Sequence, residues 1–128
     1  MTWNRAPVAA ALVDVLAEAT NDQVMVFDRP PATLNAPAVV VGRANTVTYG
    51  VGALGIDNAE LPLIVIGGLD DMDGVEALKM ACRLAVAADP ALGGVVQLAY
   101  PGEERNWRGL NIGGADFLAV DLILQIRM

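Results

Sequence analysis

A chain of 128 residues is the size of one ordinary domain and buries about two-thirds of the surface that its unfolded form exposes. Apolar residues make up 55% of the chain and aromatic residues only 5%, so it is too apolar to be disordered and its core is expected to consist of Ala, Val, Leu and Ile. The net charge of −7 argues against sequence-specific nucleic-acid binding, and the absence of histidine excludes His-based triads and the usual zinc sites.

A helix is predicted at the N-terminus, ending near residue 20. Asn4 is a suitable N-cap, and Pro7 fits a first helical turn. Apolar residues then recur at helical spacing, at Val8, Leu12, Val13, Leu16 and Ala19. Although the segment superficially resembles a signal peptide, Asp14 and Glu18 interrupt its apolar face. No apolar run reaches the roughly 20 residues of a membrane helix, so we expect a helix outside the membrane.

A proline-rich arm follows a short predicted strand at residues 23–27. The stretch "RPPATLNAPAVVVGR", residues 29–43, contains Pro30, Pro31 and Pro37, which fix φ and push the residues before them into extended conformations. Three consecutive valines then form a short strand. We expect this arm to cross the subunit surface, with Arg29, Pro30, Pro31 and Arg43 among the residues that contact a neighbouring chain.

A glycine-rich ribbon, "TVTYGVGALGID", comes next and carries Tyr49, a further candidate interface residue. Its glycines at positions 50, 52 and 55 match the dinucleotide-loop pattern, which requires a helix to open at the third glycine. A strand at residues 61–66, beginning at Pro62, follows instead. Because there is no room for the helix, a flexible ribbon or bulged strand is the better interpretation, with no bound cofactor.

The segment "DDMDGVEALKMACRLAVAADP" predicts the clearest helix. Asp73 and Glu76 are spaced as in a capping box, and Asp89 followed by proline ends the helix. Its buried stripe is expected to comprise Val75, Leu78, Cys82, Ala85 and Val86. The lone Cys82 is then a buried thiol in a reducing compartment, with no histidine to activate it.

The same segment has part of a calcium-loop pattern. Asp71, Asp73 and Gly74 fit loop positions three, five and six, but Leu69 and Met80 stand where the first and last carboxylates belong. No metal site is therefore expected. The acidic pairs Asp57 with Glu60 and Glu103 with Glu104 are interpreted as solvated loop charges and not as a glycosidase-like pair, which requires one carboxylate in an apolar pocket.

Two strands are predicted at the C-terminal end, at residues 95–100 and 117–126, joined by a polar projecting loop or hairpin, "PGEERNWRGLNIGGA". In the loop, Arg105, Trp107 and Arg108 are of the types enriched at interface hot spots. The alternative is a hairpin whose Trp107 folds back on its own sheet. The order of elements predicts an α+β fold: a mainly antiparallel or mixed sheet with two helices on one face, an extended arm and a glycine-rich hairpin.

The order of these segments resembles the tail terminator and tail-completion proteins of long-tailed bacteriophages. The likeness spans nearly the whole chain and depends on the N-terminal helix, "PPATLNAPAVVVG", the glycine-rich ribbon leading to "LPLIVIGG", the helix "VEALKMACRLAVAA" and the final pair of strands. It involves no catalytic signature. Other neck, connector or head-completion components of a virion, and a small-molecule binding domain, remain alternative interpretations.

This resemblance implies a structural virion protein without enzymatic activity or cofactor. Such a protein forms a homo-oligomer, a hexameric ring at the head-proximal end of the tail tube, which ends tube polymerisation. Its implied partners are the tail-tube protein and the head–neck connector protein, while genomic DNA passes through the lumen without sequence-specific binding. The implied location is the tail or neck of the virion, after assembly in the host cytoplasm.

Overall fold

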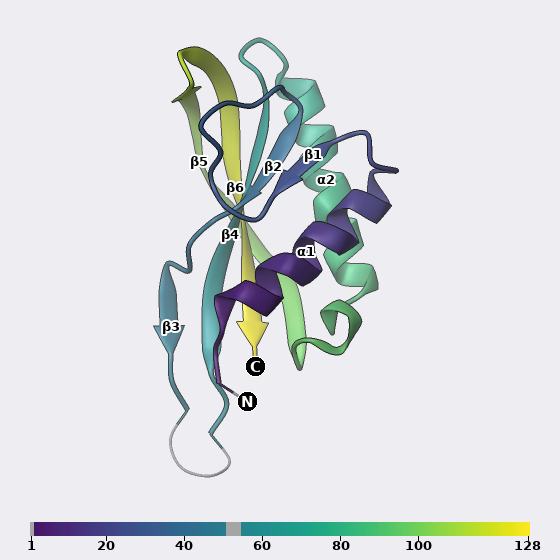
Figure 1. Ribbon diagram of the computed structural model, residues 1–128, viewed down its shortest axis with the longest axis vertical. Coiled ribbons are helices and arrows are strands. Elements are labelled where there is room, and N and C mark those ends of the chain that lie inside the picture. The colour runs from purple at the N-terminus through teal and green to yellow at the C-terminus, as the bar shows by residue number, and fades with distance from the viewer. Residues whose placement is uncertain (1, 51–54) are drawn as a thin grey trace.

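The computed structural model describes residues 2–50 and 55–128, which form two α-helices, a short 3₁₀ helix and six strands (Figure 1). Residues 51–54, within the predicted glycine-rich ribbon, lie outside the described part. The elements in chain order are α1 (Arg5–Ala19), β1 (Met25–Phe27), β2 (Ala38–Val41), β3 (Thr46–Thr48), β4 (Asn58–Gly68), α2 (Met72–Ala88), η1 (Leu92–Gly94), β5 (Leu98–Ile112) and β6 (Ala115–Arg127).

The strands form one mixed sheet in the order β1-β2-β4-β6-β5. β2 pairs with residues 63–66 of β4, and β3 pairs with residues 58–60 of the same strand. Only β1 and β2 run parallel among the described pairs; the others are antiparallel. Pro62 lies inside β4, where the predicted strand was expected to begin. It falls between the β4 segments that pair with β2 and β3, so its missing N–H interrupts neither ladder.

The two helices cover one face of the sheet, which confirms the α+β prediction (Figure 1). Alternate residues of the central strands point toward them, including Val39, Leu63 and Leu122. Val75, Leu78, Cys82 and Val86 of α2 are buried as predicted, whereas Ala85 of the predicted stripe is half-buried. Asn4 caps α1 as predicted. The N-cap of α2 is Asp71, which accepts a hydrogen bond from the Gly74 N–H at 3.0 Å, and not the predicted Asp73.

The arm, residues 28–37, covers the opposite face of the sheet. Leu34 and Ala36 pack against a second apolar cluster formed by Val40, Ile66, Phe117 and Ala119. The arm therefore folds back on its own sheet because it covers apolar side chains that the helices leave bare. Near the β5–β6 turn the fit is close: a Cβ on Gly113 would lie 2.7 Å from Thr33 Cγ2.

The segment predicted as a projecting loop or hairpin is a hairpin, and the prediction of a loop is wrong. Residues 101–112 continue β5, which pairs with β6 along its length except at irregularities between Pro101 and Glu103 and between Arg105 and Arg108. The actual turn is the two-residue pair Gly113–Gly114, both at positive φ, as tight hairpins require. The strand expected from residue 95 begins at Leu98, because η1 and a turn occupy the preceding residues.

Candidate functional site

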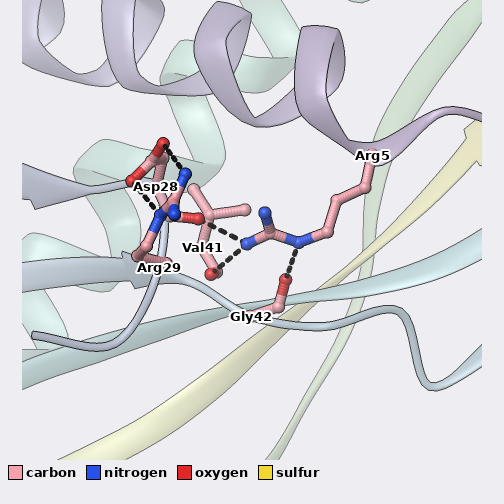
Figure 2. Close-up of polar contacts among 5 residues, drawn as sticks. All are labelled: Arg5, Asp28, Arg29, Val41 and Gly42. Carbon is pink, nitrogen blue, oxygen red and sulfur yellow. Dashed lines mark hydrogen bonds and ion pairs between the residues drawn. The ribbon is translucent and has the colours of Figure 1, made fainter.

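One arginine fastens the base of the arm to the rest of the subunit (Figure 2). The Arg5 guanidinium, at the start of α1, donates to the carbonyl oxygens of Gly42 at 3.0 Å, of Val41 at 2.8 Å, and of Asp28. These carbonyls belong to the end of β2 and the start of the arm. Because a guanidinium has several donors in a fixed plane, Arg5 holds three segments together at once.

The interface residues predicted on the arm and ribbon lie at the surface. The Arg29 side chain is 78% exposed and pairs with the neighbouring Asp28 at 3.3 Å, a contact that contributes little when exposed (Figure 2). Pro30 and Arg43 are exposed, and Pro31 is half-buried. Tyr49, just after β3, is 66% exposed. Their contact with another chain stays a prediction.

The structure separates the three predicted interface residues of β5. Arg105 pairs in register with Asp121 and Arg108 with Ala119, so both arginines belong to the sheet face without helices. Asn106 and Trp107 form the bulge between them, with Asn106 at φ 63°. Trp107 is half-buried and packs against the helix-side core, as in the alternative of a tryptophan folded back on its own sheet.

A lysine on α2 joins Trp107 to the helix. Lys79 Nζ lies 2.7 Å from a carboxylate oxygen of Glu76 and 2.7 Å from Glu104 Oε1, and 5.8 Å from the Trp107 ring centre. Trp107 Nε1 donates to Glu104 Oε2 at 2.8 Å. Burial opposes the charge of Lys79, but its hydrogen bonds to Glu104 and Glu76 outweigh this and raise the pKa of Lys79.

The helix-free face carries a second set of paired charges. Arg105 Nη2 lies 2.5 Å from Glu60 Oε1 and 2.6 Å from Glu103 Oε1. Arg108 Nη1 lies 3.1 Å from Asp121 Oδ1. The other carboxylate oxygen of Asp121 accepts a hydrogen bond from Asn106 Nδ2 at 3.2 Å. Three of the acids predicted to be solvated in loops, Glu60, Glu103 and Glu104, therefore lie on strands, and each has a cationic partner.

Asp57 also differs from the prediction of a solvated loop charge, because it is buried. Its carboxylate accepts hydrogen bonds from the backbone N–H of Trp3 at 2.6 Å and of Gly50 at 2.9 Å. These two bonds, in that order, lower the pKa of Asp57 below its usual value. Its backbone exchanges hydrogen bonds with Met128, so Asp57 ties both chain ends to the ribbon.

The described residues contain no cluster of side chains suited to bind a metal ion. Across residues 2–50 and 55–128, no group of three or more His, Cys, Asp or Glu side chains is placed to hold a metal ion. Cys82 is buried as predicted, and burial raises the pKa of its thiol to about 12. Of the helices described, none is long and apolar enough to cross a membrane.

The contacts that the sequence interpretation missed are long-range pairs. Lys79 and Glu104 are 25 residues apart, and Arg5 and Val41 are 36 apart. One local indication of this cluster of charges is present in the sequence: Glu76 and Lys79 are three residues apart on one helix, a spacing that favours an ion pair.

No known protein family matches the sequence, and no curated protein matches it. The fold does match solved structures. One is a chain in a structure described as the virion of a native gene transfer agent particle, with a TM-score of 0.50 and 15% sequence identity. The match covers 94% of this chain and 92% of the other, so the two share their fold over nearly their whole lengths.

Proposed function

We propose that this chain is a structural protein of a phage-like virion. The observation that carries the proposal is the fold match over 94% of the chain to a component of a gene transfer agent virion. Two features agree with it. The charged side chains of β5 are paired with one another and with α2, β4 and β6, and the buried Cys82 thiol has a raised pKa, so neither set provides a free nucleophile or base.

More specifically, we propose the role of a tail terminator: a hexameric ring at the head-proximal end of the tail tube. In this role the ring ends tube polymerisation, contacts the tail-tube protein and the head–neck connector protein, and lets DNA pass through its lumen. The order of segments supports this role, and so does an acidic chain of net charge −7, which does not retain DNA. The protein has no enzymatic activity and needs no cofactor in this role.

Particles that carry a tagged copy of this chain test both levels of the proposal. We expect the tag in purified particles, and a reconstruction of the upper tail should show the chain as a ring around the axis. Absence from the particles would contradict the structural role. A ring next to the portal, separated from the tube end, would favour the alternative of a neck or connector component. A single copy, or copies away from the axis, would exclude the ring.

A further inference from the structure

The outward face of α1 is unusually apolar for a surface helix. The helix buries Val8, Ala9, Leu12 and Leu16 against the core. Its outer side nevertheless exposes Ala6, Pro7 and Ala10 ahead of Asp14 and Glu18, and leaves Val13 and Val15 half-exposed. Surface helices normally place polar residues on the side away from the core. The first half of α1 is apolar on both sides, so it is expected to be covered on both sides.

Three shallow grooves border this outer side. One lies between α1 and β1 beside Val13 and Val26, one between α1 and η1 beside Ala10 and Leu92, and one between α1 and α2 beside Val15. The charged side chains that line these three grooves are all acidic: Asp14, Glu18, Asp28 and Asp89. We call the outer side of α1 with these grooves the helix surface. A partner that covers it must supply apolar side chains and positive charge.

This chain has a segment of that chemistry, and its residues Leu34 and Ala36 pack on the opposite side of the sheet. Residues 29–43 contain Arg29 and Arg43 and no acidic residue, although the whole chain has a net charge of −7. Within this segment the arm exposes Pro30, Ala32 and Pro37 together with Arg29, which stays 78% exposed in its surface ion pair with Asp28. Its prolines restrict the backbone, which lowers the entropy lost when the arm is immobilised by a partner.

From this complementarity we infer that copies of this chain associate head to tail, with the arm of one copy on the helix surface of the next. A symmetric contact between two helix surfaces would place Asp14 and Glu18 of both copies together, and like charges disfavour it. Asp28, at the base of the arm, lines one groove of the helix surface, whereas Leu34 and Ala36 of the arm pack on the opposite face of the sheet (Figure 1), so each copy can contact two neighbours. Such heterologous contacts close into rings or continue as filaments. The inference rests on the proposed function, because it describes how that ring would be joined.

Site-directed crosslinking tests this arrangement. Ala10→Cys places a thiol on the helix surface, and Ala32→Cys places one on the arm; both positions are exposed. The native Cys82 is buried, with a pKa raised to about 12, so it adds little background reaction. The probe is a bis-maleimide, applied to the concentrated protein and to purified particles. Ala87→Cys, at an exposed position of α2 outside these grooves, replaces Ala10→Cys in the matched control.

We expect the Ala10→Cys and Ala32→Cys double variant to give a ladder of covalent oligomers in at least one of the two samples, and each single variant to stay monomeric. Arg29→Glu in the double variant should weaken the ladder several-fold. The inference fails if no ladder forms in either sample, if Ala10→Cys alone gives dimers, or if Ala87→Cys with Ala32→Cys gives an equal ladder. If the ladder forms but the protein is absent from purified particles, the proposed virion role is contradicted and the contact between copies is not. A ring in particles without the ladder would contradict only this contact.

Discussion

Lys79 of α2 and Glu104 of β5 form an ion pair of 2.7 Å that joins the second helix to the edge strand of the sheet. The Lys79 side chain is only 8% exposed and has Glu76 as a second partner at 2.7 Å. The other oxygen of Glu104 accepts the indole N–H of Trp107. One carboxylate therefore fixes both the buried ammonium and the tryptophan of the β5 bulge.

Replacing that tryptophan should destabilise the subunit. We expect Trp107→Ala to reduce the free energy of unfolding by about 2 kcal/mol, below the 3–5 kcal/mol typical of fully buried aromatic residues because Trp107 is half-buried. Trp107→Phe, which keeps an apolar ring but loses the N–H bond to Glu104, should cost less. Urea unfolding measures both. An unchanged stability of Trp107→Ala, together with failed particle assembly, would instead support Trp107 as an interface residue.

The same carboxylate predicts a pH effect. Hydrogen bonds from Lys79 and then from Trp107 lower the pKa of Glu104 below its usual value of 4.5. Glu104 therefore stabilises the folded state above about pH 4.5, and this contribution is lost as the pH falls through the lowered pKa. Since its side chain is 43% exposed, we expect Glu104→Gln to cost only about 0.5–1 kcal/mol at pH 7.

Thermal melting from pH 7 to pH 3 checks this effect. The difference in melting temperature between the wild type and Glu104→Gln should shrink as the solution is acidified. Glu18→Gln, at an exposed position of α1, is the matched control and should leave stability nearly unchanged. A constant difference between wild type and Glu104→Gln across the range would show that the charge of Glu104 contributes nothing.

Asp57 should show a pH effect of the same sign. Backbone N–H groups of Trp3 and then Gly50 lower its pKa from the usual 3.8, so the ionised carboxylate stabilises the fold above that pH and the contribution is lost on acidification. In Asp57→Asn, the side-chain NH2 group replaces one carboxylate oxygen. It is itself a donor, so it cannot accept the hydrogen bond from one of the two backbone N–H groups. We expect a lower melting temperature at pH 7 and faster hydrogen exchange at the Trp3 and Gly50 amides. Unchanged exchange at both amides would contradict this tether.

The sequence predicted well the features that depend on local periodicity. The capped start of α1 and the buried stripe of α2 follow from residue type and spacing, because burying one face of a helix fixes which residues are apolar. The α+β class follows from their order.

The prediction failed where tertiary pairing overrides local chemistry. Residues 101–112 contain a proline, two glycines and several charges, which favour turns, yet β6 offers a long apolar strand for pairing and the bulges absorb the misfit. Glu60, Glu103 and Glu104 were predicted as solvated loop charges for the same reason. A cation 25 residues away, such as Lys79 for Glu104, leaves no local signal in the sequence.

Cys82 should be unreactive in the folded protein. The thiolate is the reactive form, and burial both raises its pKa to about 12 and blocks access by reagents. We expect no reaction with a thiol-specific chromogenic reagent at pH 8 on a timescale of minutes, and stoichiometric reaction in denaturant. Rapid labelling of the native protein would show that α2 separates from the sheet.

Arg5 should determine whether the arm stays in place. Its guanidinium donates to three carbonyls, from β2 and from the base of the arm, and hydrogen bonds from a charged donor contribute about 1.5–3 kcal/mol each before solvent exposure reduces them. We expect Arg5→Ala to reduce the free energy of unfolding by about 2 kcal/mol. Arg5→Lys should recover only part of it, because an ammonium does not reproduce the planar fork.

A local readout distinguishes this role of Arg5 from a general loss of stability. The arm is held on the sheet by Leu34 and Ala36 and at its base by Arg5, so Arg5→Ala should speed hydrogen exchange in residues 28–36 more than in β4 or β6. Arg83→Ala is the matched control, because the only side-chain hydrogen bond of that exposed arginine among the described residues is to the Met80 sulfur. It should leave exchange in the arm unchanged. If Arg5→Ala accelerates exchange equally throughout the sheet, the guanidinium supports the whole fold and is not a specific anchor of the arm.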